Sequence, residues 1–338
     1  MKTRAQIVKT SYYLPSKRFT NEEYFDIFPE SKGDSNLSKI GIKERRIVEE
    51  DELASDLAVK AAEKLINEHA IDRSSIDFVL FCAQEFDYYT PTTACLIQDR
   101  LNLPKASGAL DFNLGCSGFV YGLSIAKGLI ESVGVKNVLL LTASTLTKTF
   151  HPKDKSSRFV FGDGAAATLV SNTGNEEGIG QFVFGTDGSG YDKIIIKDGG
   201  ARNKISDTSS VDKYDDFGNQ HSDDKFLMKG AAIFNFSVRT VPKMILELLE
   251  KSNIKEDEID LYIFHQANQF LLQTLQRIME IPDEKFYIHY ELVGNTVSST
   301  IPIALNQALK EKRVSKGQRV MLVAFGVGLS WSGTTITI

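Results

Sequence analysis

An internal repeat constrains the fold of this 338-residue chain more than any other feature. The segment SSIDFVLFCAQEF in the first half resembles DEIDLYIFHQANQF in the second, and two further pairs of segments match at nearly the same offset. LGCSG aligns with VGNTV, and NVLLLTAS with RVMLVAFG, so the matches pair Ile76 with Ile259, Cys116 with Asn295, and Val138 with Val320. Three collinear matches indicate a duplicated unit. We therefore expect two similar halves, residues 1–178 and 179–338, that pack as pseudo-twofold mates.

Short β-rich runs alternate with longer segments of helical period, which is typical of layered α/β folds. The clearest helix follows Gly115, because apolar residues recur every three or four positions from Phe119 to Val133. Buried strands are predicted at residues 78–81, 138–141, 261–264 and 320–325. The sequence therefore predicts a layered α/β fold, with Cys116 in the first turn of a helix.

The stretch from Lys197 to Lys229 is rich in Asp, Ser, Gly and Asn and carries no regular apolar pattern. Such a composition predicts a long surface loop outside the core. We assign no functional site to it.

Composition and charge exclude several classes of function. The net charge of −5 gives no basic surface for nucleic acid or for an anionic membrane. The N-terminal residues have no apolar run of signal-peptide length, and no later segment approaches the roughly 18 apolar residues of a membrane span. We expect a cytoplasmic protein. Its three cysteines form no CxxC pair, so neither a disulfide framework nor a metal site is predicted.

The repeat brings three distant residues towards one place. Equivalent loops of the two halves should face each other, which sets the loop of Cys116 against the loop of Asn295. His265, at the end of the strand at 261–264, should lie beside both. A helix N-terminus favours a thiolate and can stabilise the oxyanion of a tetrahedral intermediate. A neutral histidine and an asparagine amide could polarise a second carbonyl and stabilise an enolate.

Each of these residues also has an ordinary structural interpretation. Cys116 could be a buried small residue at a turn, and His265 could be a core or capping residue. Asn295 could simply cap the helix that follows it. Cys82 and Cys95 lie in apolar segments, and we interpret both as structural. The repeat favours the functional interpretation of the first three, because it brings them together.

Several motifs resemble one known family over nearly the whole chain. DFNLGCSGF, FVFGDGAAATLV, IFHQAN, GNTVSSTIPIAL and AFGVGLSW occur in the order found in β-ketoacyl-acyl carrier protein synthase III. ERRI and ASDLAVKAAEKLI near the N-terminus are also similar to that family. The resemblance implies a thiolase-like fold with duplicated α/β halves in five αβαβα layers. It also implies a homodimer whose active site lies at the base of a pantetheine tunnel.

The resemblance implies a decarboxylating condensation that initiates fatty acid or related acyl-chain synthesis. Cys116 would accept the acyl group of an acyl-CoA, while His265 and Asn295 would hold the thioester carbonyl of malonyl-acyl carrier protein. The oxyanion of the first step would lie against the amide of Cys116 and that of Val327, or of Gly328. The product would be a β-ketoacyl-acyl carrier protein. Coenzyme A and carrier-protein thioesters are substrates in this scheme, and no metal or redox cofactor is implied.

Further substrate contacts are implied at the tunnel mouth, where the sequence also departs from the family. Asn268 of HQAN would contact pantetheine. Lys39 and Ser35 replace an arginine and a tryptophan that commonly grip the adenine of coenzyme A. Phe270 and Lys155 stand where arginines are frequent, while Arg158 and Arg277 keep positive charge nearby for an acidic carrier protein.

One departure concerns the acyl pocket. Thr90 precedes Pro91 at a dimer contact where the family often inserts a phenylalanine. The smaller side chain should leave room for primers longer than acetyl.

Three alternatives remain open. A catalytically silent partner of an active synthase would not need Cys116, His265 and Asn295. A thiol hydrolase would use the same nucleophile but would need no malonyl site. A specialised secondary-metabolism ketosynthase or acyltransferase of the same fold would use a different acyl acceptor, and the altered mouth keeps this interpretation open.

Overall fold

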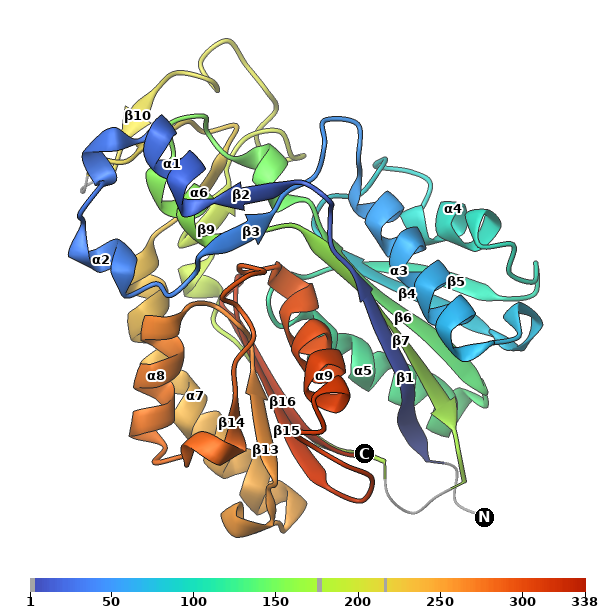
Figure 1. Ribbon diagram of the computed structural model, residues 1–338. Coiled ribbons are helices and arrows are strands. Elements are labelled where there is room, and N and C mark those ends of the chain that lie inside the picture. The colour runs from blue at the N-terminus through green and yellow to red at the C-terminus, as the bar shows by residue number, and fades with distance from the viewer. Residues whose placement is uncertain (1–3, 175–177, 216–217) are drawn as a thin grey trace.

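The computed structural model describes residues 4–174, 178–215 and 218–338, which form two five-stranded sheets with helices around and between them (Figure 1). The first sheet contains β1 (Ala5–Tyr13), β4 (Phe78–Ala83), β5 (Gly108–Asn113), β6 (Asn137–Ser144) and β7 (Gly164–Asn172). The second contains β8 (Ile179–Thr186), β13 (Leu261–Phe264), β14 (Phe286–Tyr287), β15 (Arg319–Gly326) and β16 (Ser330–Thr337).

The two sheets share one topology. Their strand orders are β5-β4-β6-β7-β1 and β14-β13-β15-β16-β8, and corresponding neighbours run in the same relative direction. The register repeats as well, because Phe78 pairs with Val138 in the first sheet and Leu261 with Val320 in the second. The duplication expected from the sequence repeat is confirmed. The proposed division at residues 178 and 179 falls just before β8 and stays a prediction.

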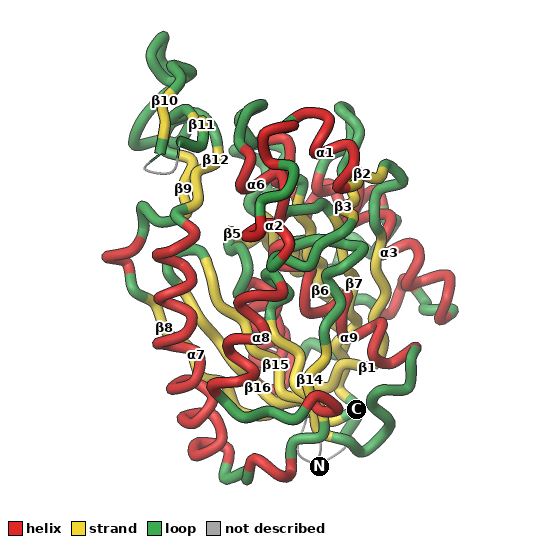
Figure 2. The backbone as a smooth tube through the Cα atoms, turned by 60° about the vertical axis from the view of Figure 1, so that its left-hand side comes forward, coloured by secondary structure: helices red, strands yellow, loops and turns green. Residues whose placement is uncertain are grey.

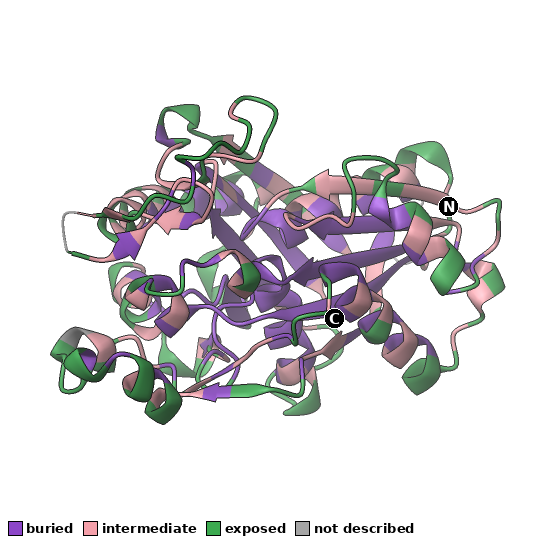
Figure 3. Ribbon diagram, turned by 90° about the horizontal axis from the view of Figure 1, so that it is seen from above, coloured by how far each residue is buried: buried purple, intermediate pink, exposed green. Residues whose placement is uncertain are grey.

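The helices lie in three layers that alternate with the sheets. The outer layers are α3 (Ala54–His69) with α4 (Thr93–Arg100), and α7 (Gly230–Ser252) with α8 (Gln269–Ile278); the middle layer is α5 (Gly118–Gly128) with α9 (Thr300–Lys310). Three apolar cores lie between the layers: one under each outer helix layer, and one around the middle helices that both sheets share. The burial colours in Figure 3 show the sheets as the most deeply buried part of the molecule. The five layers match the expected arrangement.

The middle layer is packed closely enough to require small residues. A Cβ atom on Gly118 would lie 2.3 Å from the Sγ of Cys82, so only glycine allows α5 to begin this near to β4. Leu123 on α5 and Leu305 on α9 are fully buried in the core that both sheets share. The start of α5 is therefore fixed against the first sheet.

The smaller elements surround one end of the sheets. They are α1 (Asn21–Ile27), α2 (Ser35–Ser38), α6 (Lys155–Val160), and the short paired strands β2 (Arg18–Thr20) with β3 (Glu44–Arg46), β9 (Ile194–Ile196) with β12 (Phe226–Met228), and β10 (Lys213–Tyr214) with β11 (Gln220–His221). In the described residues, no helix has the length and apolar character needed to cross a membrane.

The polar stretch at 197–229 forms an excursion at the top of the molecule (Figure 2). Residues 197–214 are mostly exposed. Phe226 of β12 is buried in an apolar core and Met228 lines a cavity, so the expectation that the whole stretch lies outside the core and has no part in a site is wrong at its C-terminal end.

Polar side chains attach the excursion to the start of α6. The side chain of Asn219 accepts a hydrogen bond from the Lys155 amide at 2.8 Å and donates one to Asp154 Oδ1 at 2.9 Å. His151 Nε2 lies 3.1 Å from Asp212 Oδ1. The excursion is therefore tied to the body of the protein at defined points.

Arg45 joins β3 to α6 from a fully buried position. Its Nε donates to the Phe159 carbonyl at 2.8 Å and its Nη1 to Asn21 Oδ1 at 2.6 Å. The guanidinium also lies 4.4 Å from the centre of the Phe159 ring. Burial lowers the pKa of Arg45 to about 10, so the side chain stays charged at neutral pH.

We expect Arg45→Ala to lower the free energy of unfolding by about 3 kcal/mol, since hydrogen bonds from a buried charged group are lost and a cavity remains. Urea denaturation followed by far-UV circular dichroism measures the change. Arg18→Ala is the control, because that side chain on β2 is 64% exposed and its 3.5 Å ion pair with Glu44 should contribute less than about 1 kcal/mol. Equal losses in the two variants would contradict the structural role of Arg45.

Candidate active site

Cys116 lies between β5 and α5 and lines a cavity of about 600 Å³. His265 and Asn295 line the same cavity, which we call the Cys116 cavity. Its walls are mainly apolar and include Phe159, Phe161, Ile194, Met228, Phe234 and Phe325. The structure thus brings together the three residues that the repeat placed near one another, although they come from three separate segments.

Burial dominates the electrostatics of the Cys116 thiol. The residue is only 8% exposed, and this burial raises the pKa of the thiol to about 11. Backbone hydrogen bonds from Val327 and Cys116 itself act in the opposite direction. The lowered pKa expected from the helix N-terminus is therefore wrong for the substrate-free protein, because loss of solvation outweighs the amide groups.

A glycine turn at the end of β15 approaches the thiol closely. A Cβ atom on Gly326 would lie 2.8 Å from the Sγ of Cys116, so a side chain at this position would occupy the place of the thiol. Val327 follows directly, and its backbone hydrogen bond to Cys116 puts its amide beside the sulfur. Gly328, the second amide considered from the sequence, is the next residue of the turn. The oxyanion role of these amides stays a prediction.

His265 has a polar neighbour at each nitrogen of its ring. Its backbone amide donates to the Val323 carbonyl at 2.7 Å, which extends the pairing of β13 with β15 by one residue. Nδ1 lies 2.7 Å from the hydroxyl of Thr300, and Nε2 lies 3.5 Å from Nδ2 of Asn295. Phe325 packs edge-on against the ring, with 5.7 Å between ring centres. Burial lowers the pKa of His265 to about 3, so the imidazole is neutral at physiological pH.

Asn295 is oriented by the backbone that follows it. The amide of Val297 donates to its Oδ1 at 2.9 Å, which leaves the Nδ2 hydrogens facing His265. Val297 has a φ of +55°, a left-handed conformation that β-branched residues rarely adopt. Hydrogen bonds between the backbones of Asn295 and Val160, and of Gly162 and Asn295, fasten this loop to the first half of the chain. The loop is thus specialised to present the amide of Asn295 to the cavity.

Three of the predicted mouth residues line the Cys116 cavity. Lys39, Asn268 and Phe270 all contribute to its wall. Asn268 also caps α8, because its Oδ1 accepts a hydrogen bond from the Leu271 amide at 3.0 Å. Phe270 stacks on Phe234, with 5.1 Å between the ring centres, and remains 48% exposed. The mouth is therefore apolar at the position where we noted the loss of an arginine.

Lys155, predicted at the mouth, and Thr90, predicted at the acyl pocket, do not line this cavity, and Ser35 lines a second cavity instead. Lys155 forms an ion pair with Glu30 at 2.7 Å on the surface. Thr90 is exposed at the end of the loop after β4, next to Tyr89, which is 96% exposed. The role of Thr90 at an acyl pocket stays a prediction.

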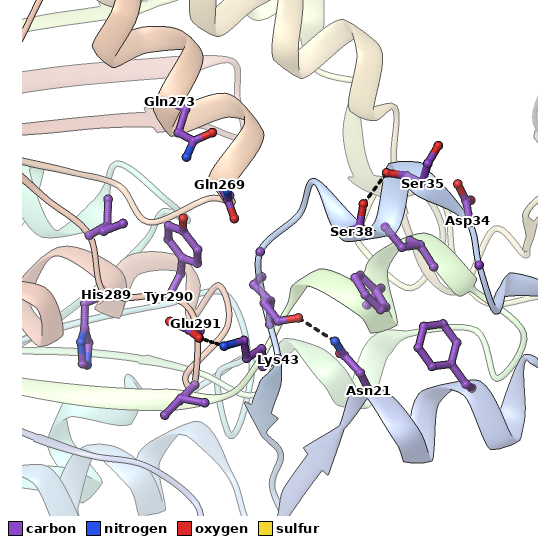
Figure 4. A pocket seen from close by; sticks show the side chains of 18 residues that line it. Asn21, Asp34, Ser35, Ser38, Lys43, Gln269, Gln273, His289, Tyr290 and Glu291 are labelled. Atoms are coloured by element: carbon purple, nitrogen blue, oxygen red, sulfur yellow. Dashed lines mark hydrogen bonds and ion pairs between the residues drawn. The ribbon is translucent and has the colours of Figure 1, made fainter. Parts of the chain in front are cut away.

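A larger cavity, of about 840 Å³, lies beside the segment at 33–43, between α1 and α8 (Figure 4). Polar side chains surround it, including those of Gln269 and Gln273 on α8 and the ion-paired Lys43 and Glu291. It shares only Leu37 and Phe159 with the Cys116 cavity and contains none of the three candidate catalytic side chains. We therefore place the chemistry in the smaller cavity.

Sequence reasoning missed several residues of the site. Thr300 contacts His265, but its place in the GNTVSSTIP segment was the only feature of the sequence that could have pointed to it. The AFGVG motif could have identified Phe325 and Gly326, since both line the cavity. In the described residues, no group of three or more His, Cys, Asp and Glu side chains is arranged to bind a metal ion.

Two protein families match parts of the chain. The family described as 3-oxoacyl-[acyl-carrier-protein (ACP)] synthase III matches residues 110–188, and the C-terminal family of the same enzyme matches residues 249–338. The first match contains Cys116, and the second contains His265 and Asn295.

Full-length relatives extend the match to nearly the entire chain. A β-ketoacyl-[acyl-carrier-protein] synthase III of Clostridioides difficile is 35% identical over 336 residues, covering 99% of both chains. A crystal structure of a 3-oxoacyl-(acyl-carrier-protein) synthase III is 44% identical with a TM-score of 0.97, covering 99% of this chain and 100% of that one. The Thermus thermophilus enzyme is 30% identical with a TM-score of 0.87, covering 98% and 99%. The thiolase-like fold and the acyltransferase assignment are confirmed, and the chain belongs to the β-ketoacyl-[acyl-carrier-protein] synthase III family.

Proposed function

We propose that the protein condenses an acyl-CoA primer with malonyl-acyl carrier protein, with loss of carbon dioxide, to give a β-ketoacyl-acyl carrier protein. The observation that carries this proposal is the convergence of Cys116, His265 and Asn295 on one apolar cavity. A thiol and two neutral N–H donors suit the two successive carbonyl reactions of such a condensation.

In the first half-reaction, the sulfur of Cys116 attacks the carbonyl carbon of the primer thioester. The amides of Cys116 and Val327, which already point at the sulfur, would stabilise the oxyanion that forms. Collapse of the intermediate breaks the bond to coenzyme A, which leaves as a thiol with the proton that Cys116 gave up. The acyl group remains on Cys116.

In the second half-reaction, the malonyl group loses its carboxylate as carbon dioxide. The electron pair of the broken bond forms an enolate, whose oxygen would accept hydrogen bonds from His265 and Asn295. The enolate carbon attacks the acyl-cysteine, and the Cys116 sulfur leaves and takes up a proton. Burial keeps the imidazole neutral, so His265 acts as a hydrogen-bond donor in this step.

No metal or redox cofactor enters the proposal, because decarboxylation itself supplies the carbanion. Lys39, Asn268 and Phe270 would contact the pantetheine arm where it passes the mouth of the Cys116 cavity. We also propose that the protein acts in the cytoplasm, which suits its three free thiols.

A homodimer is part of the proposal. β5 is an edge strand of the first sheet, none of its six residues is buried, and Leu110 is 43% exposed. A second copy that pairs at this edge would cover the strand. Thr90 and Tyr89 are exposed in the same half and would then be available to the partner's acyl pocket.

Intact-mass spectrometry with acetyl-, hexanoyl- and decanoyl-CoA tests the nucleophile and the primer together. We expect one acyl adduct per chain, lost in Cys116→Ser and retained in Cys95→Ser, whose exposed thiol is the matched control. Malonyl-acyl carrier protein should discharge the adduct and give a β-ketoacyl product two carbons longer than the primer. An adduct that malonyl cannot discharge would favour an acyltransferase with a different acceptor, and an adduct that survives in Cys116→Ser would refute the nucleophile.

The burial of Cys116 predicts a pH dependence for its alkylation. The thiolate is the reactive form, and because the pKa of the thiol is raised to about 11, the thiolate fraction falls about tenfold for each pH unit below that value. We expect the rate of iodoacetamide labelling of Cys116 in the substrate-free protein to rise about tenfold per unit between pH 7 and about 9. Peptide mass spectrometry follows the site, and a rate that levels off below pH 8 would contradict the raised pKa.

If two copies pair through β5, a substitution on that strand should weaken the dimer. We expect Leu110→Lys to sediment as a monomer at micromolar concentrations where the wild-type protein is a dimer, because a charge at the paired edge would be buried without a partner. Analytical ultracentrifugation measures the effect. Phe184→Lys is the control, since Phe184 is similarly exposed, at 44%, on β8 at the edge of the second sheet. A wild-type monomer, or a dimer that survives Leu110→Lys, would refute this interface.

A further inference from the structure

We propose that the hydroxyl of Thr300 holds His265 in the neutral tautomer that carries its proton on Nε2, so that His265 and Asn295 present two N–H donors to one substrate oxygen. Thr300 is the first residue of α9, and its Oγ1 lies 2.7 Å from Nδ1 of His265 in a buried contact. It touches no reacting atom in this scheme and is therefore a positioning residue.

A threonine hydroxyl has one proton to donate, and Thr300 has two neighbours that could receive it. One is Nδ1 of His265, and the other is the carbonyl of Val297, which lies 3.1 Å from Oγ1. If the proton points to the carbonyl, Nδ1 must carry a hydrogen and Nε2 is bare. If the proton points to Nδ1, the hydrogen of the neutral ring is on Nε2.

The distances favour donation to the ring. O–H···O bonds in proteins are most often about 2.7–2.8 Å long, whereas N–H···O bonds span about 2.7–3.2 Å and are most often about 2.9–3.0 Å long. The 2.7 Å contact to His265 fits a hydroxyl donor, and the 3.1 Å contact to Val297 is long for one. The Val297 carbonyl also receives the backbone N–H of Thr300, so it stays satisfied without the hydroxyl.

The other end of the ring agrees with this assignment. Nδ2 of Asn295 can only donate, and its orientation is fixed by the bond from the Val297 amide to Oδ1. A bare Nε2 would accept from Nδ2 at an ordinary hydrogen-bond distance, but the two nitrogens lie 3.5 Å apart. This separation suits two donors that share an acceptor between them.

Val297 therefore orients the amide of Asn295, and Thr300 selects the tautomer of His265. The amide of Val297, whose φ is +55°, donates to Oδ1 of Asn295, and the hydroxyl of Thr300 reaches His265 from the next turn. Two N–H groups that donate to one oxygen form an oxyanion hole, which stabilises the negative charge that develops there. The buried imidazole stays neutral, and the hydroxyl decides which nitrogen bears its hydrogen.

The kinetic part of this inference rests on the proposed condensation, whereas the tautomer is a property of the resting protein. An Nε2–H group serves the enolate oxygen of the malonyl half-reaction directly. It cannot receive the proton of Cys116. Loss of the Thr300 hydroxyl should therefore affect malonyl decarboxylation more strongly than acylation of Cys116.

Nitrogen-15 NMR of histidine-labelled protein tests the tautomer without substrate. His265→Gln assigns the signals, since the chain contains five histidines. We expect the wild-type protein to show a protonated Nε2 and a bare Nδ1, and Thr300→Val to lose this preference. A protonated Nδ1 in the wild type, or an unchanged tautomer in Thr300→Val, would overturn the inference.

Separate assays of the half-reactions test the positioning role. We expect Thr300→Val, which keeps the side-chain shape, to slow malonyl decarboxylation about 10- to 100-fold and acylation of Cys116 by much less. Thr300→Ser should restore decarboxylation to within about threefold, because it restores the hydroxyl. Thr296→Val is the matched control, since the buried hydroxyl of Thr296 has no hydrogen-bond partner, and it should decarboxylate at the wild-type rate.

The outcomes separate this inference from the proposed function. A wild-type protein with the expected tautomer but no malonyl decarboxylation would refute the condensation and leave the assignment of Thr300 intact. Equal slowing of both half-reactions in Thr300→Val, or no recovery in Thr300→Ser, would reduce Thr300 to a packing residue.

Discussion

The packing of two helices between two sheets is the constraint on which the rest of this structure depends. α5 and α9 share one apolar core with both sheets, so their N-terminal ends cannot move independently of either half. Cys116 precedes the first helix, and Asn295 lies in the loop that leads to the second. Because each helix occupies the same place in its own half, duplication of one α/β unit is sufficient to bring these two residues to a common cavity.

Burial also sets the chemistry at that cavity. Loss of water raises the pKa of the thiol and lowers the pKa of the imidazole, so both groups are neutral before substrate arrives. A site of neutral groups depends on the direction of its hydrogen bonds rather than on charge. This explains why the backbone around Val297 adopts an uncommon conformation there and why a threonine hydroxyl contacts the histidine ring.

The sequence repeat and the apolar runs were enough to predict the duplicated fold, the four central strands and the meeting of Cys116, His265 and Asn295. The pKa of Cys116 could not be predicted, because it depends on how completely the turn at Gly326 encloses the sulfur. Thr300 was missed for a similar reason. Its contact with His265 follows from the register of α9 against β13, and sequence spacing does not reveal that register. Surface positions such as Lys155 were hardest to place, since the sequence does not reveal its ion pair with Glu30.

The stacked rings of Phe270 and Phe234 at the cavity mouth have a consequence for how substrates arrive. A ring of cations would draw an acidic carrier from a distance and make the association rate fall steeply with ionic strength. Aromatic surface acts only at contact, through the release of water as the pantetheine arm slides past. Capture of a pantetheine arm by these stacked rings would therefore act at short range and depend less on ionic strength than capture by a ring of cations.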